Sequence, residues 1–146
     1  MDLRLRIYLD IIRVPLLLII FYNALSVPVM VYERLAFLQL FFTSYVQWAV
    51  LVFIAAWAGL LSVKKCKEAA LSFIGPTKTS IVAGAWLGFL GGMIGGFLGA
   101  LMTVDKGVTI TAMLDLIRNF VVPGTIVSSV VACISSSWYR WNTRFD

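Results

Sequence analysis

A run of glycines from Gly84 to Gly99, reading GAWLGFLGGMIGGFLG, constrains the fold of this chain more than any other feature. Residues 81–104 around the run carry no charged side chain, and a stretch of that length can cross a membrane as one helix. Successive residues of a helix turn by about 100°, so the glycines fall within roughly 140° of one helix face. The seven glycines are Gly84, Gly88, Gly91, Gly92, Gly95, Gly96 and Gly99.

Such a glycine face favours lipid over water as the surroundings of the helix. In water, each interior glycine costs a helix about 1 kcal/mol relative to alanine. In lipid, the backbone bonds to itself, and a face without side chains lets a second helix approach until the backbones touch. We therefore predict a transmembrane helix of the glycine-zipper kind, packed closely against a neighbour.

The composition is that of an integral membrane protein. Hydrophobic residues make up 61% of the chain and charged residues 13%, against about 45–50% and about 25% in soluble proteins. Hydropathy predicts an all-α fold with four transmembrane helices, at about residues 14–32, 35–63, 79–102 and 121–138. These spans leave too little chain for a soluble module, so residues 1–146 are predicted to form a single membrane domain.

The basic residues divide unequally between the two sides of this four-span arrangement. Nine lie in the N-terminal segment, the connection between the second and third spans, or the C-terminal segment, and three lie on the other side. The nine are Arg4, Arg6, Arg13, Lys64, Lys65, Lys67, Lys78, Arg140 and Arg144; the three are Arg34, Lys106 and Arg118. Since cytoplasmic loops carry excess Lys and Arg, both termini are predicted on the cytoplasmic or matrix-like side of a prokaryotic plasma membrane or an organelle membrane.

Two segments next to the spans are predicted to be short interfacial helices. One is the mixed-charge N-terminus, residues 1–13, which leads to Pro15 in the first turn of the first span. The other is the segment of residues 108–120, where Asp115 and Arg118 share one helix face. In the interface this pair is solvated and of little consequence. If the segment instead dips inward and breaks at Pro123, it is a discontinuous helix of the kind that places substrate sites in transporters. We favour the interfacial interpretation.

The fourth span carries a stripe of small residues that matches the glycine run in period. The stripe is Gly124, Ser128, Ala132 and Ser136, spaced four apart like Gly84, Gly88, Gly92 and Gly96. The two spans are antiparallel neighbours, so we expect them to dock through these stripes. Because the glycine face is wider than one neighbour needs, we expect a second partner: the second span through Ala55, Gly59 and Ser62, or another subunit.

Polar side chains inside the spans allow two interpretations. Gln39, Thr43 and Gln47 share one face of the second span, and Asn23 lies at a depth similar to that of Gln47. These amides can be interhelical hydrogen-bonding groups that contribute about 0.6 kcal/mol on average. Together with Ser128, Ser129, Asp115 and Arg118, they can instead line a polar path. We favour the first interpretation.

Catalytic and redox chemistry have little support in the sequence. The chain has no histidine, and no acidic residue falls in the central part of a predicted span. We therefore expect no enzyme activity, no metal or other cofactor, and no nucleic-acid binding. Cys66 and Cys133 are predicted to stay unpaired, with palmitoylation of Cys66 as an open alternative. Two functions remain: a non-catalytic membrane protein that packs with itself or with other membrane subunits, and a small oligomeric channel or transporter.

Overall fold

A computed structural model describes residues 3–31, 33–68, 75–102, 104, 107 and 109–143, and this part of the chain is helical. Its elements are α1 (Leu3–Val31), the 3-10 helix η1 (Glu33–Phe42), α2 (Ser44–Glu68), α3 (Pro76–Leu101) and α4 (Ile110–Asn142). All four α-helices are long and apolar enough to cross a membrane. The predictions of a helical fold and of four candidate spans are therefore confirmed.

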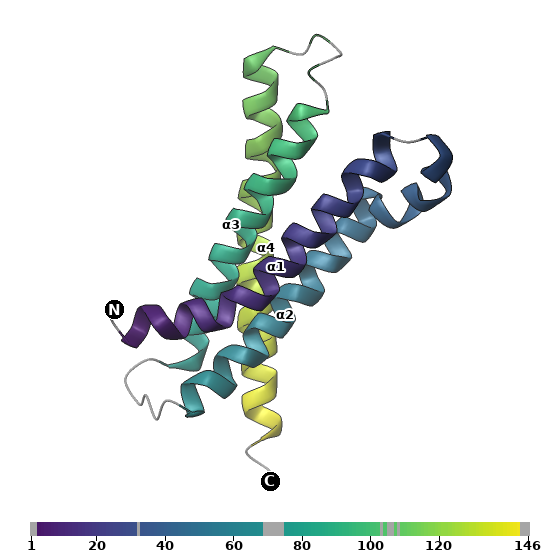
Figure 1. Cartoon of the computed structure of the whole chain (residues 1–146). Coiled ribbons are helices and arrows are strands. Elements are labelled where there is room, and N and C mark those ends of the chain that lie inside the picture. The colour runs from purple at the N-terminus through teal and green to yellow at the C-terminus, as the bar shows by residue number, and fades with distance from the viewer. Residues whose placement is uncertain are drawn as a thin grey trace.

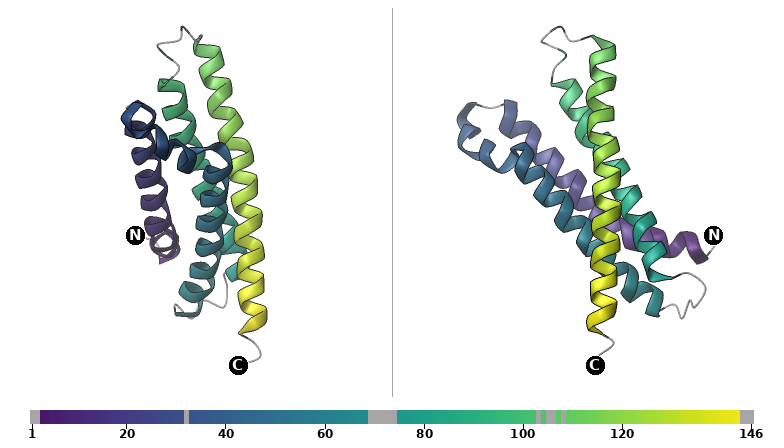
Figure 2. Two further views of the ribbon diagram at one scale, coloured as in Figure 1. Left: turned by 90° about the vertical axis from the view of Figure 1, so that its right-hand side faces the viewer. Right: turned by 180° about the vertical axis from the view of Figure 1, so that it is seen from behind.

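The helices form two antiparallel hairpins, α1–α2 and α3–α4, that pack against each other at an angle (Figure 1). The first residues of α1 and α3 and the last residues of α2 and α4 lie toward one end of the bundle. The hairpins cross near the middle, and at the opposite end η1 and the start of α4 lie apart (Figure 2). This arrangement places the inter-hairpin contact at mid-height in the bundle.

The N-terminal segment is part of α1, so the prediction of a separate interfacial helix there is wrong. Helix α1 runs unbroken from Leu3 to Val31 with Pro15 and Pro28 inside it. Proline removes one backbone hydrogen bond, a loss that neighbouring helices can offset in a membrane span. Pro15 is fully buried between other elements rather than placed in a first turn.

The second predicted span begins too early, because residues 33–42 form the separate helix η1. Polar contacts hold the end of η1 against both neighbouring helices. The Tyr22 hydroxyl of α1 donates to the Phe41 carbonyl at 2.7 Å, and Gln47 Nε2 of α2 donates to the Phe42 carbonyl at 3.2 Å. The Tyr22 and Phe42 rings lie 5.1 Å apart between centroids.

Helix α4 is also continuous, which corrects the prediction of an interfacial helix before the fourth span. It begins after Thr109, whose hydroxyl accepts a hydrogen bond from Ala112 N, and it runs through Pro123 to Asn142. Its 33 residues span about 50 Å, against about 30 Å of hydrocarbon. The excess lets the first turns project beyond the hydrocarbon, where Asp115 and Arg118 are exposed.

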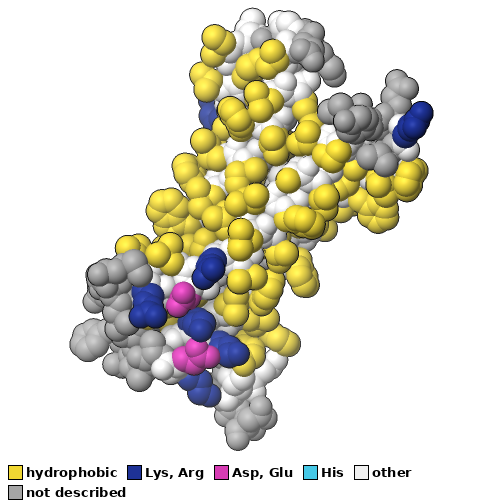
Figure 3. Space-filling model, in the orientation of Figure 1, with side chains coloured by type: hydrophobic (Ala, Val, Ile, Leu, Met, Phe, Trp, Pro, Cys, Tyr) yellow, Lys and Arg dark blue, Asp and Glu magenta, His cyan; other side chains and the backbone are white. Residues whose placement is uncertain are grey.

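The apolar core lies where α1, α2 and α3 meet. Ile11 of α1, Ile54 of α2, and Ala83 and Leu87 of α3 are almost fully buried in one cluster. Large apolar side chains cover much of the outer surface, while Lys and Arg gather toward the end of the bundle that holds the termini (Figure 3). This is the surface expected of a multi-pass membrane protein, whose outer faces meet acyl chains.

Candidate functional site

The glycines at every fourth position of α3 lie directly against the backbone of α4. A Cβ added at Gly84 would lie 2.5 Å from the Ser128 carbonyl oxygen, and one at Gly92 would lie 2.6 Å from Val121 Cα. At Gly96 the corresponding distance to Ile117 Cα is 2.7 Å, and at Gly88 the added Cβ would overlap the Gly124 carbonyl. Real Cβ atoms do not approach backbone atoms this closely. Glycine, which has no Cβ, is therefore the residue that fits at these positions.

The two small-residue stripes overlap over half their length rather than along all of it. Gly124 lies against Gly88, and Ser128 lies against both Gly84 and Gly88. Gly92 and Gly96 meet larger residues of α4, whose backbone nevertheless approaches them closely. Toward the other end of the stripe, Ser136 faces Ser80. The remaining stripe residue, Ala132, lies against both Gly84 of α3 and Gly59 of α2.

Hydroxyl groups join the helices where the backbones are close. Ser128 Oγ lies 2.6 Å from the Gly84 carbonyl oxygen across the interface and 2.6 Å from the Gly124 carbonyl oxygen of its own helix. The Ser80 and Ser136 hydroxyls lie 2.9 Å apart, with either as donor. These serines are fully buried, so their hydrogen bonds satisfy groups that would otherwise be unpaired in an apolar interior.

The rest of the glycine face meets α1 and a side chain of α4. A Cβ at Gly91 would lie 3.3 Å from Ile19 Cδ1, and one at Gly95 would lie 3.6 Å from Asn23 Oδ1. A Cβ added at Gly99 would lie 3.2 Å from Leu116 Cδ2. The sequence offered the second span or another subunit as the second partner, whereas the nearest atoms to Gly91 and Gly95 belong to α1.

Helix α2 presents its own glycine, Gly59, to α4. An added Cβ at Gly59 would overlap Ser135 and the Ala132 carbonyl, and Ser135 Oγ donates to the Ala56 carbonyl at 2.9 Å. Ala55 is fully buried, and the buried Ser62 donates to the Ala58 carbonyl of its own helix at 2.8 Å. The nearest atoms to a Cβ added at the glycines of α3 belong to α4 or α1 rather than to α2.

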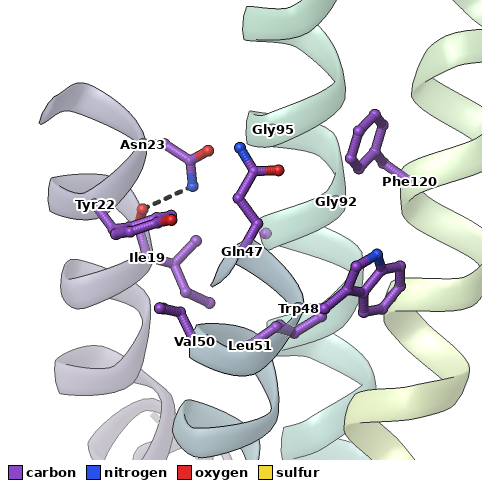
Figure 4. Close-up of a pocket in the computed structure, with 12 residues that line it drawn as sticks. Ile19, Tyr22, Asn23, Gln47, Trp48, Val50, Leu51, Gly92, Gly95 and Phe120 are labelled. Atoms are coloured by element: carbon purple, nitrogen blue, oxygen red, sulfur yellow. Dashed lines mark hydrogen bonds between the residues drawn. The ribbon is translucent and has the colours of Figure 1, made fainter. Parts of the chain in front are cut away.

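A cavity of about 70 Å³ lies where the two hairpins cross (Figure 4). All four helices contribute to its walls, which are mainly apolar. Its lining residues are Ile19, Tyr22, Asn23, Gln47, Trp48, Val50, Leu51, Gly91, Gly92, Gly95, Phe120 and Gly124. A space of this size can hold water, which needs only about 10–15 Å³ of such volume per molecule.

Asn23 and Gln47 are the polar side chains with amide groups in this cavity, and they reach it from different helices. Each amide nitrogen donates to a backbone carbonyl close to it in sequence: Asn23 Nδ2 to Ile19 O at 2.8 Å and Gln47 Nε2 to Phe42 O at 3.2 Å. With their nitrogens engaged in this way, the amide oxygens are the acceptors available for water or another donor.

The other members of the predicted polar path do not join this cavity. Gln39 and Thr43 are exposed, and the Thr43 hydroxyl donates to the Leu40 carbonyl at 3.3 Å. Arg118 Nη2 and Asp115 Oδ1 lie 3.8 Å apart, with 72% and 58% of their side chains exposed. These residues therefore do not share one cavity with Asn23 and Gln47, and α4 continues through Pro123 rather than breaking there. The structure brings together Asn23 and Gln47 alone.

Sequence reasoning missed the aromatic walls of the cavity. Tyr22 and Trp48 are direct chain neighbours of Asn23 and Gln47, and Phe120 lies just before the Pro123 region. The adjacency of each aromatic residue to an intramembrane amide was the available signal. What the sequence does not contain is the angle between the hairpins, and that angle decides which side chains meet at the crossing.

The cysteines are free in the part of the chain that the structure describes. Cys66 is 5% exposed, and its Sγ lies 3.6 Å from the Thr79 hydroxyl. This burial argues against palmitoylation, which requires an accessible thiol. Neither a family model nor a curated protein nor a solved structure matches the chain.

Proposed function

We propose that this chain is a non-catalytic, multi-pass membrane protein with a structural or accessory role, either as a homo-oligomer or as a subunit of a larger membrane complex. Its partners in this proposal are the lipid bilayer and itself or other membrane subunits, with no nucleic acid, cofactor or metal. Both termini lie on the cytoplasmic or matrix-like side, because the excess of Lys and Arg is there.

The observation that carries the proposal is the backbone contact between α3 and α4. Gly84, Gly88, Gly92 and Gly96 meet α4 without intervening side chains, and buried serine hydroxyls join the two helices. The glycine zipper in this proposal works inside the chain and builds a closely packed hairpin. Contacts with other subunits then use the outward apolar faces. These faces are extensive, because only 22–33% of the most apolar window of each candidate span is buried inside the bundle.

The cavity at the crossing of the hairpins favours a second function, a small oligomeric channel or transporter. Asn23 of α1 and Gln47 of α2 face one space from two helices of the first hairpin, and a solute path needs polar groups contributed by several elements. Against this function, Asp115 and Arg118, the charged residues just before the lining residue Phe120, are exposed rather than directed into the cavity. The accessory role is therefore our preferred proposal.

Purification in a mild detergent, with mass spectrometry of co-eluting proteins, tests the preferred proposal. An oligomer of this chain or a stoichiometric membrane partner supports an accessory role. Flux measurements in liposomes complete the test, using Gln47→Leu beside the control Gln39→Leu, whose side chain is exposed outside the cavity. Solute flux abolished by Gln47→Leu alone, with a monomeric and partner-free protein, would replace the accessory role with transport.

A further inference from the structure

A groove at the end of the bundle that holds the C-termini of α2 and α4 combines basic, aromatic and hydroxyl side chains. It is lined by Val63, Lys64, Lys67 and Glu68 of α2 and by Tyr139 and Thr143 of α4. Lys and Arg gather toward this end of the molecule, next to the apolar surface of the spans (Figure 3). The groove therefore lies where a membrane protein meets lipid headgroups.

The groove has an excess of positive charge. Glu68 is the acid among its lining residues, and its Oε2 pairs with Lys65 Nζ at 3.1 Å. Lys64 and Lys67 lie three residues apart on one side of α2, are exposed, and have no ion pair within the described residues. The C-termini of α2 and α4 add only about half a negative charge each, so the two lysines dominate.

We propose that this groove binds the phosphate group of an anionic phospholipid. Lys64 and Lys67 supply mobile ammonium donors, and Tyr139 supplies a phenolic O–H. Basic pockets between transmembrane helices on the cytoplasmic side suit such headgroups. Trp138 and Trp141, exposed to 62% and 65%, flank Tyr139 on α4 and are residue types that sit at headgroup level. The acyl chains of the bound lipid continue along the apolar outer surface.

Native mass spectrometry of the full-length protein in a neutral detergent tests this site, with phosphatidylglycerol as the titrated lipid. The test variant is Lys64→Gln/Lys67→Gln, and the matched control is Arg6→Gln/Lys78→Gln, whose side chains are exposed and lie outside the groove. The control removes the same charge from the same end of the bundle but leaves the groove lysines in place. Each lysine near an anionic headgroup strengthens binding about five-fold, so we expect about thirty-fold weaker binding in the test variant. The control should stay within about two-fold of the wild type.

Three results would overturn the proposal. Equal losses in the two double variants would mean that overall charge, rather than the groove, attracts the lipid. Equal affinity of the wild type for phosphatidylcholine would show that the negative charge is not recognised. Displacement of the lipid by an equal concentration of inorganic phosphate would identify free phosphate as the ligand. Unchanged thermal unfolding of both variants, expected because Arg6, Lys64, Lys67 and Lys78 are all exposed, would exclude misfolding as the cause of a loss.

Discussion

Substituting alanine for single glycines of α3 should change the stability of the protein differently at two positions that lie three residues apart, Gly92 and Gly95. At Gly92 the new Cβ would lie 2.6 Å from Val121 Cα and 3.0 Å from the Phe120 carbonyl oxygen, both of them backbone atoms. At Gly95 it would lie 3.6 Å from Asn23 Oδ1, an ordinary contact distance. Both substitutions add the same methyl group to the same helix, so Gly95→Ala is a matched control for Gly92→Ala.

The expected magnitude follows from these distances. Carbon atoms pack best about 3.5–4.0 Å apart, so Gly92→Ala requires α3 and α4 to separate by roughly 1 Å at this point. Overpacking of this kind typically costs about 1–3 kcal/mol. The higher helix propensity of alanine, about 1 kcal/mol in water, applies at both positions and cancels in their comparison. Gly92→Ala should therefore be less stable than Gly95→Ala by about 1–3 kcal/mol.

Denaturant unfolding in dodecyl maltoside, followed by tryptophan fluorescence, measures this difference. The chain has five tryptophans, and Trp48 lies beside the crossing of the hairpins. A lower unfolding midpoint for Gly92→Ala than for Gly95→Ala is the expected result. If both variants unfold at the wild-type midpoint, the close approach of α3 to α4 does not exist in the folded protein and the packing argument fails.

Three further perturbations test separate parts of the structure. Ser128→Ala should lower the free energy of unfolding by about 0.6 kcal/mol in the same assay, because it removes the hydroxyl that faces the Gly84 carbonyl. An unchanged free energy of unfolding would mean that this contact contributes nothing to stability. In a Cys133→Ala background, Cys66 should react with a maleimide only after unfolding, and rapid labelling of the native protein would contradict its burial. Gly107→Ala should cost about 1–2 kcal/mol, because the φ of Gly107 is +69°, although no atom of the described residues lies within 4 Å of the added Cβ. An unfolding midpoint equal to that of the wild type would contradict this backbone conformation.

The four long apolar helices and the close approach of the glycine run to a neighbouring helix were predictable because both depend on local pattern. A stretch of uncharged apolar residues marks a span wherever it packs, and the period-four spacing of Gly84, Gly88, Gly92 and Gly96 places them on one face of a helix. The helix ends were less predictable. Pro15 and Pro123 suggested boundaries, yet α1 and α4 continue through them, because neighbouring groups in a bundle can satisfy the backbone that proline frees.

The composition of the site depended on geometry that the sequence does not carry. The similar depth of Asn23 and Gln47 was predictable from their positions in two spans, and the structure places both at one cavity, where each amide nitrogen donates to a backbone carbonyl close to it in sequence. Gln39 and Thr43 were assigned to the same path because the second span was taken as one helix, but η1 carries Gln39 away from the bundle. The identity of the second neighbour of the glycine face depended on the angle between the hairpins.

Disulfide trapping between Ser80→Cys and Ser136→Cys, in a Cys66→Ala/Cys133→Ala background, tests most directly whether α3 packs on α4 of its own chain. The two serine hydroxyls lie 2.9 Å apart, so their sulfur replacements should cross-link rapidly within one chain. Ser137→Cys in place of Ser136→Cys turns the thiol away by about 100° and should not cross-link. An intrachain disulfide specific to the first pair is the predicted result. A disulfide that forms only between differently tagged chains, or equally well with Ser137→Cys, would contradict the packing on which the whole account rests.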